Sequence, residues 1–168
     1  MTVTPIVLVS IASEYRSSIE DLTIPPAGCL YVGDALKKAG YNVVIQHISS
    51  NELDAVAHQI IKLSPLFVGF SILTGSPIVH SAYLSKKIKA HLPQTAIVWG
   101  GIHPSLTPSE CLKEPFVDFV VQGEGEITSQ ELADALTQNR SFSDILGLCW
   151  KKGDGELIIN PRRPLMKN

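Results

Sequence analysis

The chain has 168 residues, which corresponds to about one domain at roughly 150 residues per domain. Charged residues make up 18% and hydrophobic residues 45% of the sequence, and this composition excludes a disordered tail or a coiled coil. The formal net charge is −2, from 14 Lys and Arg against 16 Asp and Glu, so charge gives no indication of nucleic-acid binding. We therefore expect one compact, rather apolar domain.

Targeting and membrane signals are not recognisable in the sequence. No Lys or Arg precedes the first apolar run, as a signal peptide requires. The longest apolar stretches, such as residues 66–73, are far shorter than the ~20 residues that span a bilayer. Cys29, Cys111 and Cys149 share no Cys-x-x-Cys spacing, and an odd number does not suggest a secreted disulfide scaffold. These features predict a cytoplasmic protein that contacts neither membrane nor nucleic acid.

The first predicted strand covers residues 6–11, a continuous apolar run typical of a strand buried on both faces. The polar stretch 12–23 shows no clear period. Pro25 and Pro26 introduce a helix that Gly40 ends, because proline suits the start of a helix and glycine its C-terminal cap. The β-branched residues of 42–48 predict the second strand.

The helix that begins at Leu53 has the clearest helical periodicity, and Ser49 with Glu52 predicts a capping box before it. Residues 66–72 are expected to form the third strand. Ser76 is expected to cap a helix that runs from Pro77 to about His91.

The remaining elements alternate in the same way. Residues 96–99 and 119–121 are predicted strands, and capping boxes of Thr107 with Glu110 and of Thr128 with Glu131 predict a helix after each. The last helix is expected to end near Leu136. Residues 146–151 and 156–159 flank Gly153-Asp154-Gly155, which predicts a hairpin. Strands that alternate with helices indicate an α/β fold with a parallel sheet.

Three segments of small or polar residues follow predicted strands, where ligands of open α/β sheets bind. The candidate binding residues are Ser71, Ile72, Leu73, Thr74, Gly75, Gly100, Gly101, Ile102, His103, Gly123, Glu124 and Gly125. Glycines let a flat ligand approach the backbone, and hydroxyls supply hydrogen bonds. Such loops suit a large, mostly uncharged ligand with a few amide and phosphate acceptors. The alternative is that Gly100-Gly101 only turns the chain.

Familiar nucleotide motifs fit poorly. No glycine-rich dinucleotide fingerprint follows the first strand, where residues 12–16 contain no glycine, and no P-loop is present. The acids of a phosphoreceiver domain are missing, and Ser10 with Ser13 is a weak match to a flavodoxin phosphate loop.

Four motifs in order and spacing carry a resemblance: Pro25-Pro26-Ala27-Gly28, Val68-Gly69-Phe70-Ser71, Gly100-Gly101-Ile102-His103-Pro104-Ser105 and Gly123-Glu124-Gly125-Glu126. They resemble the N-terminal cobalamin-binding domain of radical S-adenosylmethionine enzymes, in particular the subgroup of the anaerobic magnesium-protoporphyrin monomethyl ester cyclase. The resemblance spans essentially the whole chain.

This resemblance implies a flavodoxin-like or Rossmann-like three-layer sandwich, with a five-stranded parallel sheet in the order 2-1-3-4-5 plus the C-terminal hairpin. It implies that Ser71, Leu73 and Thr74 line a slot for the benzimidazole of cobalamin. Gly100 and Gly101 would let the nucleotide tail pass, and residues 123–125 would close the far wall. Residues 1–160 are then the cobalamin-binding domain, and 161–168 are a linker toward a C-terminal domain that this chain lacks.

Two departures from the family pattern limit what the chain itself is expected to do. No His occurs before Gln46, so the cobalt-ligating His of the methionine synthase type is absent. No Cys-x3-Cys-x2-Cys is present, so the iron–sulfur cluster and S-adenosylmethionine would belong to the missing domain. We expect a module that is non-catalytic alone, from a parent oxidoreductase, cyclase or methyltransferase.

For the most conspicuous polar residues, a structural role is an alternative to a functional one. His103 is interpreted as a turn residue rather than a cobalt ligand, so no metal ligand is assigned. Glu124 and Glu126 are interpreted as complementing a helix dipole rather than as a catalytic pair. Alternative functions are a degenerate structural or interaction module, with a cleft blocked by side chains such as Ile102 or Tyr15, or a flavin- or nucleotide-binding domain. Gly101→Leu is expected to abolish cobalamin uptake and leave the fold intact.

Overall fold

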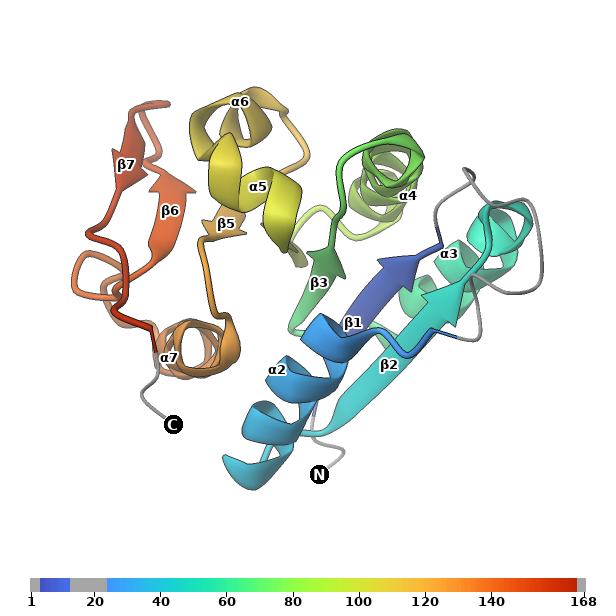
Figure 1. The fold of residues 1–168 in the computed structure, drawn as a ribbon, viewed down its shortest axis with the longest axis horizontal. Helices are drawn as coiled ribbons and strands as arrows, with labels where there is room; N and C mark the ends of the chain where they lie inside the picture. The colour runs from blue at the N-terminus through green and yellow to red at the C-terminus, as the bar shows by residue number, and fades with distance from the viewer. Residues whose placement is uncertain (1–3, 13–23, 166–168) are drawn as a thin grey trace.

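The structure, a computed structural model, describes residues 4–12 and 24–165. Seven strands form one sheet in the order β2-β1-β3-β4-β5-β6-β7 (Figure 1). The strands are β1 (Ile6–Ile11), β2 (Val43–Ile48), β3 (Phe67–Ser71), β4 (Ala96–Gly100), β5 (Phe119–Val121), β6 (Leu148–Lys151) and β7 (Leu157–Ile159). Strands β1 to β5 pair in parallel, and β6 and β7 continue the sheet antiparallel. The predicted class, the 2-1-3-4-5 order and the added hairpin are therefore confirmed, in a sheet of seven strands.

The helices cover both faces of the sheet. They are α2 (Ala27–Lys38), α3 (Leu53–Leu63) after the short 3₁₀ helix η1 (Ser50–Glu52), α4 (Ser76–His91), α5 (Ile102–Leu106), α6 (Pro108–Lys113) and α7 (Glu126–Gln138). Helices α2 and α7 lie together on one face (Figure 1). Helices α3, α4 and α6 pack on the other face. None of the helices in the described ranges has the length and apolar character needed to cross a bilayer.

Alternate residues of the strands enter two separate cores, because successive side chains of a strand point to opposite faces. In β1, Val7 and Val9 pack with α3 and α4, whereas Ile6 and Leu8 pack beneath α2. In β4, Ile97 and Trp99 enter the first core and Val98 enters the second. The sheet is thus buried on both faces, which explains the continuous apolar runs of its central strands.

The end of α2 matches its sequence signal. Gly40 has φ of +93°, and its N–H donates to the carbonyl of Lys37 at 3.0 Å. The next N–H, of Tyr41, donates to Leu36 at 3.0 Å. This pair of bonds is the Schellman arrangement, which favours glycine because the residue must be left-handed. The predicted helix stop at Gly40 is confirmed.

The capping boxes have mixed outcomes. Before α3, the backbone N–H of Ser49 donates to the carboxylate of Glu52 at 2.8 Å, as predicted. The box predicted at Thr128 is wrong, because α7 begins at Glu126 and the Thr128 hydroxyl donates to the carbonyl of Leu146 at 2.8 Å. Thr128 is fully buried, so its hydroxyl satisfies a loop carbonyl that water cannot reach.

Two further helix starts differ from the prediction. The Thr107 hydroxyl donates to the carbonyl of His103 at 3.1 Å and forms no cap. The hydroxyl thus satisfies a carbonyl of α5, a helix of five residues that is too short to show helical periodicity in the sequence. Helix α4 begins at Ser76 with Gly75 as its N-cap, one residue earlier than predicted.

The segment that follows β7 lies against the domain. Asn160 is buried, and its amide donates to the carbonyls of Phe142 and Ile145 at 2.7 and 2.9 Å. The carbonyl of Pro161 accepts the N–H of Gly147, and Arg163 contacts the Thr128 hydroxyl and the Glu131 carboxylate. Glu131 is therefore an ion-pair partner of Arg163 rather than a capping residue.

Candidate functional site

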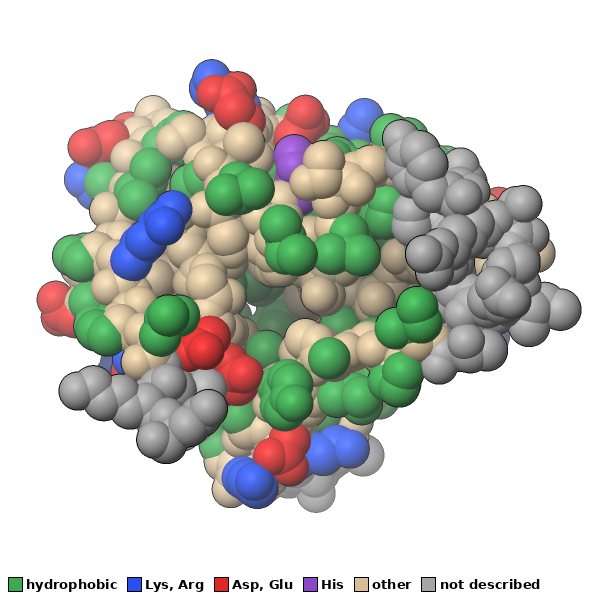
Figure 2. All heavy atoms as spheres, in the orientation of Figure 1, with side chains coloured by type: hydrophobic (Ala, Val, Ile, Leu, Met, Phe, Trp, Pro, Cys, Tyr) green, Lys and Arg blue, Asp and Glu red, His purple; other side chains and the backbone are tan. Residues whose placement is uncertain are grey.

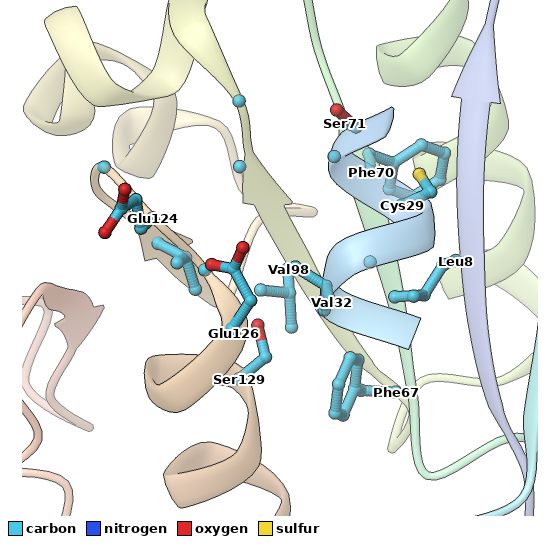
Figure 3. A pocket seen from close by; sticks show the side chains of 17 residues that line it. Leu8, Cys29, Val32, Phe67, Phe70, Ser71, Val98, Glu124, Glu126 and Ser129 are labelled. Carbon is cyan, nitrogen blue, oxygen red and sulfur yellow. The ribbon is translucent and has the colours of Figure 1, made fainter. Parts of the chain in front are cut away.

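A cleft of about 250 Å³ opens between α2 and α7 over one face of the sheet, from Phe67 at the start of β3 to Gly100 at the end of β4. It appears as a hollow in the middle of the face shown in Figure 2, with acidic side chains on one side of it. Its lining comes from four strands, from the start of each of the two helices and from the segment before α7 (Figure 3). The lining residues are Leu8, Gly28, Cys29, Val32, Phe67, Gly69, Phe70, Ser71, Val98, Gly100, Gly101, Val121, Gly123, Glu124, Gly125, Glu126 and Ser129.

The floor of the cleft is apolar. Leu8, Phe67, Val98 and Val121 point to this face of the sheet, and each is at most 5% exposed. Gly69 lies among them, and a Cβ there would come within 2.9 Å of Leu8 Cδ2 and 3.5 Å of the Phe67 ring. A larger residue at 69 would therefore displace these side chains.

Helix α2 forms one wall, and its first turn approaches β3 closely. A Cβ at Gly28 would lie 3.1 Å from the hydroxyl of Ser71, so glycine allows the helix to start against the strand end. Cys29 is buried in the next position. Burial raises the pKa of its thiol to about 12, against a smaller lowering by a hydrogen bond with the Ser71 backbone. The thiol is therefore neutral at physiological pH and adds little polarity to this wall.

Residues 123–129 form the opposite wall. A Cβ at Gly125 would lie 3.1 Å from Val32 Cγ2 of α2, so glycine at this position lets the start of α7 approach α2 closely. Glu126 and Ser129 belong to the first turns of α7 and face the cleft (Figure 3). Carboxylates at a helix N-terminus interact favourably with its dipole. The wall thus presents two carboxylates, Glu124 and Glu126, and one hydroxyl.

Ser105 connects the two glycine-containing loops. Its hydroxyl donates to the carbonyl of Gly101 at 2.7 Å and accepts the N–H of Gly123 at 2.9 Å. The loops after β4 and β5 are therefore held side by side at the carboxyl edge of the sheet. Ser105 ends the glycine-containing motif 100–105, but its bridging role was not predictable, because it depends on a contact with Gly123, 18 residues away.

Six of the twelve sequence-predicted residues line the cleft: Ser71, Gly100, Gly101, Gly123, Glu124 and Gly125. The other six do not. Ile72 is buried in the core on the opposite face, and Leu73, Thr74 and Ile102 are exposed. Gly75 caps α4, and His103 lies in α5, where its N–H donates to the carbonyl of Ile72 at 3.1 Å. Contact of any of the twelve with a ligand stays a prediction.

Gly101 has a backbone reason to be glycine. Its φ of +92° and ψ of −167° lie in a region that only glycine populates readily. A Cβ there would lie 2.8 Å from the backbone nitrogen and 3.0 Å from the oxygen of Ile72. The expectation that Gly101→Leu leaves the fold intact is therefore wrong, because the added atoms meet backbone rather than open space. Gly100 has room for a Cβ, since its nearest neighbour would be 3.7 Å away.

The sequence reasoning missed most of the floor and the α2 wall: Leu8, Cys29, Val32, Phe67, Gly69, Phe70, Val98 and Val121, together with Glu126 and Ser129 on α7. Strand alternation could have grouped Leu8, Val98 and Val121 on one face. It could not show that this face is left partly uncovered. Ile102 is exposed and does not line the cleft, so it does not block it, whereas Tyr15 lies outside the described residues.

A family model for the B12 binding domain matches residues 21–133. Curated relatives include an uncharacterized methyltransferase of Pyrococcus horikoshii, 34% identical over 149 residues, and the anaerobic magnesium-protoporphyrin IX monomethyl ester cyclase of Rubrivivax gelatinosus, 32% identical over 148 residues. These matches cover 87% and 83% of this chain but only 32% and 26% of the relatives. The chain thus spans about a third of their length or less.

Solved structures share the fold. The radical S-adenosylmethionine methyltransferase TsrM from Kitasatospora setae, with cobalamin and a [4Fe-4S] cluster bound, has a TM-score of 0.79 at 20% identity. That match covers 98% of this chain and 30% of TsrM. The cobalamin-dependent S-adenosylmethionine radical enzyme OxsB, with aqua-cobalamin and S-adenosylmethionine bound, has a TM-score of 0.78 at 18% identity over 96% of this chain and 22% of OxsB. Since the family model matches well over half of the sequence, the chain belongs to the B12-binding domain family, whose cofactor is cobalamin.

Proposed function

We propose that the cleft between α2 and α7 holds the nucleotide tail of cobalamin. The observation that carries the proposal is an open, apolar cleft at the carboxyl edge of the sheet in a member of the B12-binding family. The alternative of a degenerate cleft blocked by side chains is not supported by Ile102, which is exposed and does not line the cleft. The glycine-poor segment after β1 still offers no support for a flavin or nucleotide site.

The chemistry of the lining fits this tail. The floor of Leu8, Phe67, Val98 and Val121 suits a planar aromatic base, whose burial is favourable in proportion to its apolar area. The carboxylates of Glu124 and Glu126 can accept hydrogen bonds from ribose hydroxyls or corrin amides. They would repel a phosphate, and no Lys, Arg or His is among the cleft-lining residues of the described chain. The phosphate of the tail is therefore expected to remain in contact with water.

Binding and orientation are the roles proposed for this chain. Bound cobalamin supplies a cobalt centre for methyl transfer or electron transfer. The chain's own residues hold the tail, and the Ser105 bridge fixes the two loops at the mouth of the cleft. We propose that the chain alone is not catalytic.

The proposed partner is a radical S-adenosylmethionine domain of the same protein. The curated relatives are about three or more times as long as the region they share with this chain, which supports a parent with a further domain. We propose that the cobalamin-binding unit covers residues 1–160 and that 161–168 lead onward from it, although Pro161 and Arg163 still contact the unit. We further propose that the protein works in the cytoplasm, where its three free cysteines would stay reduced.

The test is reconstitution of the purified chain with hydroxocobalamin, followed by desalting and a visible spectrum. Gly100→Leu adds a side chain on the cleft face of β4 without a close backbone contact, and is expected to weaken retention at least tenfold. The matched control is Gly153→Leu in the β6–β7 turn, where nothing lies within 4 Å of an added Cβ. A colourless wild-type chain, or equal retention by both variants, would overturn the proposal.

A further inference from the structure

The hydrogen-bonding capacity of the cleft is unevenly distributed. The four floor side chains, Leu8, Phe67, Val98 and Val121, carry no polar atom and are almost fully buried. The backbone beneath them is engaged in the β1–β3, β3–β4 and β4–β5 ladders, so its donors and acceptors are largely satisfied. A ring lying on this floor meets hydrocarbon only.

The walls add few polar groups. On the α2 side, Val32 is apolar and Cys29 offers a buried neutral thiol that already interacts with the Ser71 backbone. On the α7 side, Ser129 and Glu126 face the cleft (Figure 3). No amide side chain, threonine or tyrosine is among the lining residues of the described chain. Besides Ser129 and Glu126, the Ser71 hydroxyl lies at the end of β3 near the start of α2 (Figure 3), so the polar side chains of the cleft lie along its walls and at this strand end, and none of the described ones lies on the floor.

Natural cobamides differ in the lower base that ends their nucleotide tail. Dimethylbenzimidazole has one ring nitrogen besides that bonded to ribose, and its opposite edge carries two methyl groups. Adenine has three further ring nitrogens and an amino group, spread around its perimeter. The few polar side chains around an apolar floor can satisfy the single nitrogen of dimethylbenzimidazole but not all the polar atoms of adenine.

We infer that the cleft selects cobamides with an apolar lower base, such as dimethylbenzimidazole, over cobamides that end in a purine. This inference rests on the proposed function and specifies the ligand class of that site. A purine inserted here loses hydrogen bonds to water that the floor cannot replace, and each such buried group is costly. Binding of the adenine-tailed cobamide is therefore expected to be at least about tenfold weaker than binding of cobalamin.

Val98 offers an isosteric test of the cause. Threonine has nearly the shape of valine and suits a β-strand, so Val98→Thr places one hydroxyl on the floor. The matched control is Val68→Thr on β3, a valine that is equally buried but faces the opposite core. Both variants bury a hydroxyl in the sheet, and only the first one changes the cleft.

The experiment measures the dissociation constants of cobalamin, the adenine-tailed cobamide and cobinamide, which lacks the tail, by equilibrium dialysis with absorbance detection. Wild type and Val68→Thr are expected to prefer cobalamin over the adenine-tailed cobamide at least tenfold, and Val98→Thr is expected to reduce that preference several-fold. The ratio of the two dissociation constants is compared between variants, because any difference in the free energies of the unbound cobamides is the same for each variant and cancels. Circular dichroism verifies that both variants are folded.

The outcomes separate the two proposals. If cobinamide binds as tightly as cobalamin, the tail does not occupy the cleft, and the proposed function fails together with this inference. If cobalamin binds much more tightly than cobinamide but the adenine-tailed cobamide binds equally well, the proposed function stands and the selectivity is overturned. An unchanged ratio in Val98→Thr would overturn the assignment of selectivity to the apolar floor.

Discussion

Two adjacent glycines at the end of β4 are expected to respond very differently to the same substitution. Gly100 has a conformation open to any residue, and an added Cβ would have no neighbour closer than 3.7 Å. Gly101 has φ of +92°, and its Cβ would lie 2.8 Å from the backbone nitrogen of Ile72. That nitrogen donates to Gly100 at 2.8 Å, and the Ile72 carbonyl accepts the N–H of His103 at 3.1 Å.

The magnitude follows from these contacts. A non-glycine residue in such a conformation costs about 1–3 kcal/mol. Displacing Ile72 weakens at least one backbone hydrogen bond, for roughly a further 1 kcal/mol. Gly101→Ala is therefore expected to lower the free energy of unfolding by about 2–4 kcal/mol. Gly100→Ala is expected to change it by less than about 1 kcal/mol, because the alanine fits without strain.

Urea unfolding followed by circular dichroism measures both values, and equal slopes for the variants and wild type would show that the comparison is sound. A Gly101→Ala chain within 1 kcal/mol of wild type would refute the reasoning. Equal destabilisation by both variants would refute it as well, since only Gly101 has a positive φ and a backbone atom within 3 Å of an added Cβ.

Three other measurements test further contacts. Asn160→Ala leaves the buried carbonyls of Phe142 and Ile145 without their amide donor and is expected to cost about 2–4 kcal/mol in thermal or urea unfolding, whereas an unchanged stability would contradict this role. Tyr41→Phe removes the hydroxyl that donates to Asp134 and ties the end of α2 to α7, for an expected loss of about 1 kcal/mol by urea unfolding. Burial raises the pKa of the Cys29 thiol from 9.0 to about 12, so the unfolded chain releases this proton at lower pH than the folded one. Its contribution to stability is present below pH 9.0 and declines as the pH rises toward 12, and Cys29→Ala should show a flatter decline in urea titrations over that window.

Much of the fold was predictable because local signals agree with it. Continuous apolar runs located the buried strands, and Gly40 located the end of α2. The Ser49–Glu52 pair was predictable because the two residues are three positions apart. The boxes at Thr107 and Thr128 failed because their hydroxyls satisfy other carbonyls, in one case 18 residues away. Residue type alone cannot reveal which of two acceptors a hydroxyl will use.

The candidate site was predictable at its edge and not in its interior. Parallel strands end at one edge of the sheet, so Ser71, Gly100 and Gly123 could be grouped from strand positions alone. The same rule included Leu73 and Ile102, which follow strands but are exposed and do not line the cleft. Loop position indicates proximity to the edge but not the direction of a side chain.

By itself, the sequence determined the alternation of strands and helices, the sheet edge that carries the small residues and the family resemblance. Each of these depends on short motifs and on their order along the chain. Only the tertiary structure decided that α2 and α7, which contact each other, leave an open cleft between their first turns over Leu8, Phe67 and Val98. It also decided that Gly101 is required by the backbone of Ile72 whereas Gly100 faces the cleft. The physical reason is that the separation of two helices and the approach of one backbone to another depend on packing between distant segments, for which no local pattern of residues provides a measure.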